Sequence, residues 1–161
     1  MKKIILITSA LAIVISSSFG QISKTSQKKK FPIQKTDAEW KKILSPKAFE
    51  VMVKDGTETP YKNAYYNNHE KGIYVSAATG EPLFSSEDKY DSSTGWPSFT
   101  KPIKADAVMY VTDKSFGTER VEVIESKTGL HLGHVFDDGP VDKGGKRYCM
   151  NSAALKFIKN K

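Results

Sequence analysis

The chain carries a single cysteine, Cys149, within the segment Arg147-Tyr148-Cys149-Met150-Asn151. The thiolate form of cysteine is a strong nucleophile, and a neighbouring cation lowers the pKa of the thiol. Alternate side chains of an extended strand point to the same face, so Arg147 and Asn151 are expected beside Cys149. A small buried hydrophobe is the commonest alternative role for a lone cysteine. Polar neighbours on the same face count against that alternative and favour a reactive thiol.

Two of the three histidines lie in the segment His131-Leu132-Gly133-His134. Side chains three positions apart on a regular strand point to opposite faces. Gly133 permits a bulge or bend that would turn both imidazoles toward one pocket, where acid–base work beside a cysteine becomes feasible. One solvated and one core histidine is the alternative. A zinc site is disfavoured, because no cysteine or further histidine nearby completes a ligand set.

The segment Gly95-Trp96-Pro97-Ser98-Phe99 is apolar and is stiffened by its proline. Trp96 is either a core aromatic in a turn or the wall of a pocket for an apolar group such as a methyl. Hydrophobic periodicity does not separate these two alternatives.

Two short helices are expected ahead of these segments. One begins with Thr36 or Asp37 as its cap, and a second begins at Ser45-Pro46. The rest of the chain alternates short apolar or β-branched runs with turn residues, a pattern that predicts strands. The predicted strands cover residues 72–75, 107–111, 120–124, 130–136 and 154–158, and a further strand carries Cys149. We therefore expect a mainly β fold, mostly antiparallel, with short N-terminal helices.

The composition is that of an ordinary folded protein, since 161 residues suit one domain and 39% of them are hydrophobic. The formal net charge of +7 raises the question of nucleic-acid binding. Much of the excess lies in a local lysine run at residues 24–30 without interleaved aromatic residues. A solvated tether explains that run better, and no nucleic-acid partner is expected. Because Cys149 is alone, no internal disulfide can form.

The start of the chain has the pattern of a secretory signal peptide: two lysines, an apolar run over residues 4–15, and a small-residue exit. The apolar run is shorter than the roughly 20 residues that span a bilayer, which disfavours an uncleaved anchor helix. We therefore expect a signal peptide at 1–20, a basic polar tether at 21–36 and the folded domain at 37–161. Export to a periplasmic or extracellular compartment follows, with no stable membrane insertion once the signal is removed.

Taken together, these motifs resemble those of the methionine-R-sulfoxide reductase (B-type) family. The matching segments are Gly95 to Phe99, His131 to Phe136, Asp138-Gly139-Pro140 and Arg147 to Ser152, with further likeness at residues 72–74, 82–86 and 153–157. They occur in order across residues 37–158, so the set is far more specific than any single motif. The family implies two antiparallel β-sheets with N-terminal helices, in agreement with the strand pattern.

The resemblance also implies a reaction. Cys149 would attack the sulfur of an oxidised methionine and become a sulfenic acid. His131 and His134 would line the site and help deliver a proton to the sulfoxide oxygen. Asn151 would support the site through hydrogen bonds.

On the substrate side, the resemblance places Trp96 against the S-methyl group of the sulfoxide. Phe136, Arg147 and Asp138 are also expected in the substrate site. The substrates would be oxidised proteins, with peptide-bound methionine-R-sulfoxide preferred over the free amino acid. No cofactor is expected to be bound, because electrons would come from an external thiol, delivered by a thioredoxin-like partner.

Three departures from the family pattern affect these expectations. Many relatives hold structural zinc with two Cys-x-x-Cys pairs, whose positions here are Ser76, Thr79, Glu125 and Thr128. No bound metal is therefore expected. Thr94 stands where many relatives have a resolving cysteine, so an outside thiol would have to regenerate the enzyme. Phe116 replaces a histidine that contributes only a peripheral contact.

Two other functions remain open at this stage. A cysteine hydrolase would pair Cys149 with a histidine, although the usual signatures around such a nucleophile are absent. A non-enzymatic β domain would bind methionine-rich partners through an aromatic pocket, and an inert, buried thiol would favour it.

Overall fold

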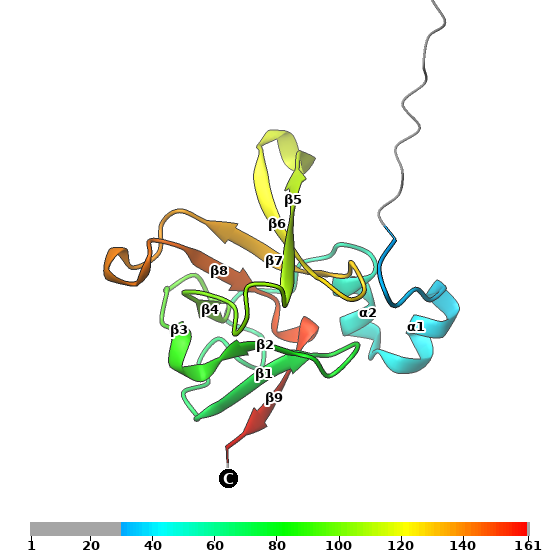
Figure 1. The fold of residues 1–161 in the computed structure, drawn as a ribbon, viewed down its shortest axis with the longest axis horizontal. Helices are drawn as coiled ribbons and strands as arrows, with labels where there is room; N and C mark the ends of the chain where they lie inside the picture. Colours follow the sequence, from blue (N-terminus) through cyan, green and yellow to red (C-terminus); the bar gives the residue numbers. More distant parts are fainter. Residues whose placement is uncertain (1–29, 161) are drawn as a thin grey trace, which may run out of the picture.

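The computed structural model describes residues 30–160 (Figure 1). The predicted signal peptide and most of the predicted tether lie outside the described residues. Among the residues that the structure describes, no helix has the length and apolar character needed to cross a membrane.

Two short helices begin at the predicted positions and lie beside the sheets (Figure 1). α1 (Asp37–Ile43) starts after Thr36, whose side chain forms a reciprocal capping box with that of Glu39. α2 (Pro46–Met52) starts after Ser45, with proline at its first position. α2 contacts the strand that carries the two histidines and the turn that follows the cysteine strand.

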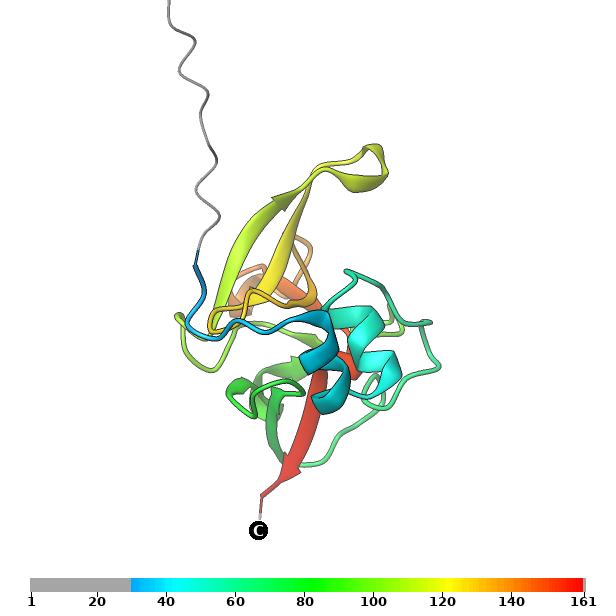
Figure 2. The same ribbon diagram turned by 90° about the vertical axis from the view of Figure 1, so that its right-hand side faces the viewer.

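The described residues form two antiparallel sheets, which confirms the mainly β fold (Figures 1 and 2). The three-stranded sheet has the order β2-β1-β9 and the six-stranded sheet the order β3-β4-β8-β7-β6-β5. The strands are β1 (Gly72–Ser76), β2 (Pro82–Ser85), β3 (Lys89–Tyr90), β4 (Ser98–Phe99), β5 (Val108–Asp113), β6 (Arg120–Glu125), β7 (His131–Phe136), β8 (Arg147–Met150) and β9 (Leu155–Lys159). The sequence pattern did not predict β2, β3 and β4, of which the last two are only two residues long.

Aromatic side chains join the two sheets into one core. Phe84 of β2 stacks on Phe99 of β4 with ring centroids 4.6 Å apart, and Tyr74 of β1 meets Phe99 edge-on at 5.0 Å. Tyr148 of β8 packs against Phe84 from the other side of the core. Because Tyr148 faces the core, the strand alternation turns its neighbour Cys149 to the opposite face of the sheet.

A β-bulge in β7 brings the two histidines to one side of the sheet. Gly133 pairs with Val123 of β6, whereas His131 pairs with Ile124, so Leu132 is the extra residue. The bulge that Gly133 was expected to permit is therefore present. A Cβ at Gly133 would collide with the backbone carbonyl of Cys149, so β7 and β8 can approach this closely only at glycine.

The four positions that would bind zinc in many relatives form a hydrogen-bonded cluster instead. Glu125 is fully buried and accepts hydrogen bonds from the hydroxyls of Thr79 and, at 2.6 Å, of Thr128. Ser76 accepts backbone N–H groups of the β1–β2 turn, including that of Thr79 at 3.3 Å. One carboxylate and three hydroxyls do not fit a structural zinc ion, which needs thiolate or imidazole ligands. The cluster ties the β1–β2 turn to the β6–β7 turn without a metal.

We predict that Glu125→Ala destabilises the fold by about 2–4 kcal/mol, because it leaves the hydroxyls of half-buried Thr79 and buried Thr128 without an acceptor. Chemical denaturation measures the free energy of unfolding directly. Glu119→Ala is the matched control, since this exposed carboxylate pairs with the exposed Lys114, at 3.4 Å, and its loss should cost less than about 0.5 kcal/mol. Equal stabilities of the two variants would show that the cluster does not replace the metal.

Candidate active site

Cys149 lies between a hydroxyl and an imidazole on the exposed face of the six-stranded sheet. In the strand register, Ser98 of β4 is directly opposite Cys149 on one side and His134 of β7 on the other. Directly opposed residues of antiparallel strands share a face, so these three side chains are neighbours.

A pocket of about 160 Å³ opens over this face. Its lining residues are Thr57, Trp96, Arg120, Gly133, His134, Phe136, Cys149, Met150 and Asn151. The structure thus brings together five of the residues expected in the site, from three separate segments of the chain. Arg147, Asp138 and His131 are not among the lining residues, although the charge of Arg147 acts on the thiol of Cys149.

Hydroxyl groups surround the thiol on the side away from the histidines. Thr94 Oγ1 lies 3.9 Å from Cys149 Sγ, and Ser92 hydrogen-bonds to Thr94 at 2.8 Å and to Ser98 at 2.7 Å. Burial raises the pKa of the Cys149 thiol, against the opposing effects of the Arg147 charge and of hydrogen bonds to Thr94 and Ser98. The sequence predicts that Arg147 lowers the pKa of the Cys149 thiol. In the structure, desolvation of the half-buried thiol affects this pKa more strongly than the charge of Arg147 does.

Arg147 is held in place rather than directed into the pocket. Its guanidinium makes two hydrogen bonds of 2.8 Å to the carboxylate of Asp138 and lies 4.4 Å from the ring centre of Phe136. This fork geometry fixes the orientation of the guanidinium. Asp138, expected in the substrate site, is an exposed residue that positions Arg147, and Arg147 in turn covers the outer side of Phe136.

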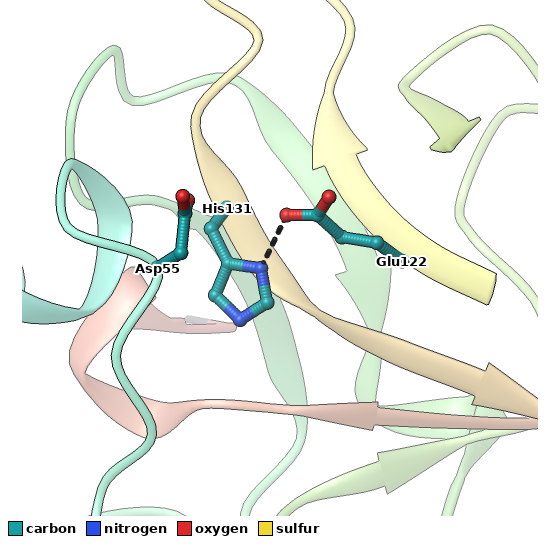
Figure 3. Close-up of side chains that lie close together, drawn as sticks. All are labelled: Asp55, Glu122 and His131. Carbon is teal, nitrogen blue, oxygen red and sulfur yellow. Dashed lines mark hydrogen bonds and ion pairs between the residues drawn. The ribbon is translucent and has the colours of Figure 1, made fainter. Parts of the chain in front are cut away.

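Each histidine of the site is paired with a carboxylate from another strand of the sheet, His131 with Glu122 of the adjacent β6 and His134 with Asp113 of β5, one strand further away. His131 Nδ1 lies 2.7 Å from Glu122 Oε1, a contact visible in Figure 3, and His134 Nε2 lies 2.8 Å from Asp113 Oδ2. The two imidazole rings meet edge-on with centroids 5.4 Å apart. Such carboxylate partners fix the orientation of an imidazole and the position of its proton.

The electrostatic surroundings keep His134 neutral and Asp113 ionised. Burial lowers the pKa of His134, although the hydrogen bond to Asp113 opposes this effect. Hydrogen bonds from Ser115, His134 and Arg120 hold the pKa of Asp113 far below its usual value. Because Nε2 of the neutral ring donates to ionised Asp113, Nδ1 carries no proton and can accept one.

Asn151 and Trp96 are both anchored to one buried residue, Glu58. Asn151 Oδ1 accepts the Glu58 N–H at 3.1 Å, and the indole N–H of Trp96 donates to the Glu58 carbonyl at 3.0 Å. The Glu58 carboxylate accepts the backbone N–H groups of Ser152 and, at 3.0 Å, of Ala153. Burial raises the pKa of Glu58, and these N–H groups oppose that shift. Glu58 therefore connects the aromatic wall of the pocket to the turn that follows Cys149.

Asn151 also reaches the inner histidine. Its Nδ2 donates to the Leu132 carbonyl at 3.1 Å and lies 3.4 Å from His131 Nε2. The amide therefore favours the tautomer of His131 whose proton is on Nδ1, facing Glu122. His131 supports the site from behind, whereas His134 lines the pocket itself.

Sequence reasoning missed Glu58, Asp113 and Glu122. Glu58 lies in a coil without periodicity. Glu122 becomes a partner of His131 through the bulged register of β6 and β7, and Asp113 reaches His134 only through the registers of β5, β6 and β7 together. With the register of β6 and β7 known, an acidic residue on the strand next to His131 would have indicated Glu122 as its partner.

A mainly β domain that holds its one cysteine beside an imidazole, in a pocket with an aromatic wall, has the features of a cysteine-dependent enzyme. Residues 44–159 match the SelR domain, which covers most of the chain. The protein therefore belongs to the methionine-R-sulfoxide reductase B family, as the motifs indicated. This membership favours a reductase over the hydrolase and the non-enzymatic binding domain.

Proposed function

We propose that this protein reduces methionine-R-sulfoxide in oxidised proteins, with Cys149 as the nucleophile and His134 as the group that moves the proton. The observation that carries the proposal is the shared pocket, in which Cys149, His134 and Trp96 face one small volume. Reduction of methionine-R-sulfoxide is the activity of the family to which the chain belongs.

In the proposed complex, the methyl group of the sulfoxide packs against Trp96 and Phe136, and its oxygen points toward His134. Both aromatic residues line the pocket together with the imidazole and the thiol. Only one of the two epimers of a chiral sulfoxide can place its methyl group, its oxygen and its sulfur against three fixed groups at the same time. This arrangement supports selectivity for a single epimer.

The reaction transfers one oxygen atom from the substrate to the enzyme. The proton of the Cys149 thiol passes to neutral His134, and the thiolate attacks the sulfoxide sulfur. The protonated imidazole then gives its proton to the sulfoxide oxygen. The resulting hydroxyl moves from the substrate sulfur to Cys149 Sγ as the original S–O bond and the new S–S bond both break, which leaves a thioether and a sulfenic acid on Cys149. The sulfoxide gains two electrons and becomes a thioether, while the cysteine loses two.

Activity on resolved epimers tests this proposal. We predict that turnover is confined to peptides containing the R epimer, and that Trp96→Ala lowers kcat/KM for them by about tenfold to a hundredfold because the methyl group loses its wall. Phe157→Leu, a change of a ring outside the pocket, is the control and should leave kcat/KM nearly unchanged. Comparable rates on R and S epimers would refute the proposal.

Recycling of the sulfenic acid requires a thiol from outside the chain, because Cys149 is the only cysteine. We propose a mixed disulfide between Cys149 and a thioredoxin-like partner, resolved by the second thiol of that partner. If the chain is exported, as its first residues indicate, this partner must be kept reduced from the cytoplasmic side, since an extracytoplasmic compartment is oxidising.

The position of Thr94 supports a direct test of this recycling scheme. Because Thr94 Oγ1 lies 3.9 Å from Cys149 Sγ, we predict that Thr94→Cys forms an internal disulfide after one turnover and uses thioredoxin more efficiently. Mass spectrometry should show loss of two hydrogens in the variant and an added oxygen or a mixed disulfide in the natural protein. Thr94→Ser is the control. Persistent sulfenic acid in Thr94→Cys would contradict the scheme.

A further inference from the structure

A second cavity, of about 330 Å³, adjoins the pocket and shares His134, Arg120 and Thr57 with it. Its other lining residues include the carboxylates of Asp55, Asp113 and Glu122. Arg120 donates to Asp113 at 2.6 Å, which offsets one of these charges. Within residues 30–160 no ion pair with a lysine or arginine offsets Asp55 or Glu122, so the cavity carries excess negative charge.

Three potential metal ligands converge there from different elements (Figure 3). Asp55 lies in the loop after α2, Glu122 on β6 and His131 on β7, and one ligand atom of each lies within 4.8 Å of the others. A zinc ion with bonds of about 2.0–2.2 Å holds its ligand atoms roughly 3–4 Å apart, so small side-chain rotations would close the set. One imidazole nitrogen and two carboxylate oxygens suit a divalent transition-metal ion.

We propose that Asp55, Glu122 and His131 bind a divalent transition-metal ion such as Zn²⁺, and that the bound ion switches off the neighbouring sulfoxide site. The sequence disfavoured a metal at His131 because no cysteine or further histidine nearby completes a ligand set. The fold supplies two carboxylates from elsewhere, and solvent in the cavity supplies the remaining ligands. Three protein ligands with solvent at the open position form a ligand set that zinc also adopts in sites with an exchangeable fourth ligand.

The coupling acts through the tautomer of His131 and rests on the proposed function. A metal on Nδ1 displaces the proton that faces Glu122, so the neutral ring must carry its proton on Nε2. Nε2 would then face the Asn151 amide at 3.4 Å, and two N–H donors would oppose each other. Asn151 then loses its contact with His131 Nε2. The hydrogen bonds that connect Asn151, Glu58 and Trp96 are disturbed as a result. A protein molecule with a metal ion bound at this site therefore does not reduce the sulfoxide.

Metal binding is best measured in a Cys149→Ser background, because a thiol would itself bind zinc. Isothermal titration with ZnCl₂ should show one saturable site. Adding Asp55→Asn or Glu122→Gln should weaken the affinity at least about tenfold, as loss of a ligand does. Asp137→Asn, a change at an exposed carboxylate that pairs with Lys146 outside the cavity, is the control and should leave the affinity unchanged. Absence of a saturable site, or equal affinity in all variants, would overturn the proposal.

Single-turnover kinetics with ZnCl₂ then test the coupling in the natural protein. Zinc should slow the reduction of an R-sulfoxide peptide, and Asp55→Asn should need at least about ten times more zinc for the same inhibition. Equal inhibition of both proteins would mean that zinc acts at Cys149, and the coupling would be wrong. Zinc binding at this site in a protein that reduces no sulfoxide would refute the proposed function and leave the metal site standing.

Discussion

Replacing Cys149 by serine should reduce the rate of methionine formation by at least about 10³-fold, because a hydroxyl is a far poorer nucleophile at sulfur. The fold should survive, since serine occupies nearly the same volume and its hydroxyl can join the hydrogen-bonding network of Thr94 and Ser98. A single-turnover assay with an R-sulfoxide peptide measures the loss.

A matched control separates loss of the nucleophile from loss of the pocket. Thr94→Val removes a hydroxyl beside the thiol and keeps the side-chain volume, so it should slow the reaction far less than Cys149→Ser does. Thermal unfolding should show similar melting temperatures for both variants. Substantial turnover by Cys149→Ser would mean that another group attacks the sulfoxide.

Replacing His134 by glutamine should slow the same step by about a hundredfold or more, the range typical of general acid–base catalysis. His134 lines the pocket and is the cross-strand neighbour of Cys149. His131→Gln should cost less, because His131 faces Asn151 and Glu122 rather than the pocket. Single-turnover rates at saturating substrate, measured for both variants, provide the comparison.

Chemical rescue distinguishes proton transfer from a structural role for His134. Added imidazole should restore part of the rate in His134→Ala, where it can occupy the space of the missing ring, and should not affect His131→Ala. Greater loss in His131→Gln, or rescue of His131→Ala alone, would make the inner histidine the proton donor. The proposed mechanism would then have to be reassigned to His131.

Much of the fold could be predicted from the sequence, and five of the expected site residues line one pocket of the structure. Short apolar runs between turn residues predicted the β7 and β9 regions, and Gly133 indicated the bulge. β3 and β4 could not be predicted, because two-residue strands have no measurable periodicity. Their pairing matters for the site, since it is β4 that brings Ser98 beside Cys149.

The supporting residues of the site depend on contacts between distant parts of the chain. Glu58 reaches Ser152 across 94 positions, and Asp113 reaches His134 across 21. Nothing local in the sequence specifies such contacts. The net pKa of Cys149 was also beyond local inference, because burial of the thiol, rather than the adjacent Arg147, dominates it.

The resemblance identified the four positions that would bind zinc in many relatives, but not what stabilises them here. Their residue types excluded a structural zinc ion. Only the packed structure brings Thr79 and Thr128 together on the two oxygens of buried Glu125. A buried carboxylate whose hydrogen bonds are satisfied can take the place of a metal cross-link between two turns. Residue types alone do not predict this replacement.

The most direct test of the central claim is one turnover of the reduced protein with a resolved R-sulfoxide peptide, in the absence of any other thiol. We predict one methionine formed per protein molecule and, in the same sample, one oxygen atom gained by Cys149, which a dione reagent traps as sulfenic acid. The S-sulfoxide peptide should give neither product. Methionine formed without oxidation of Cys149, or equal yields from the two epimers, would contradict the account.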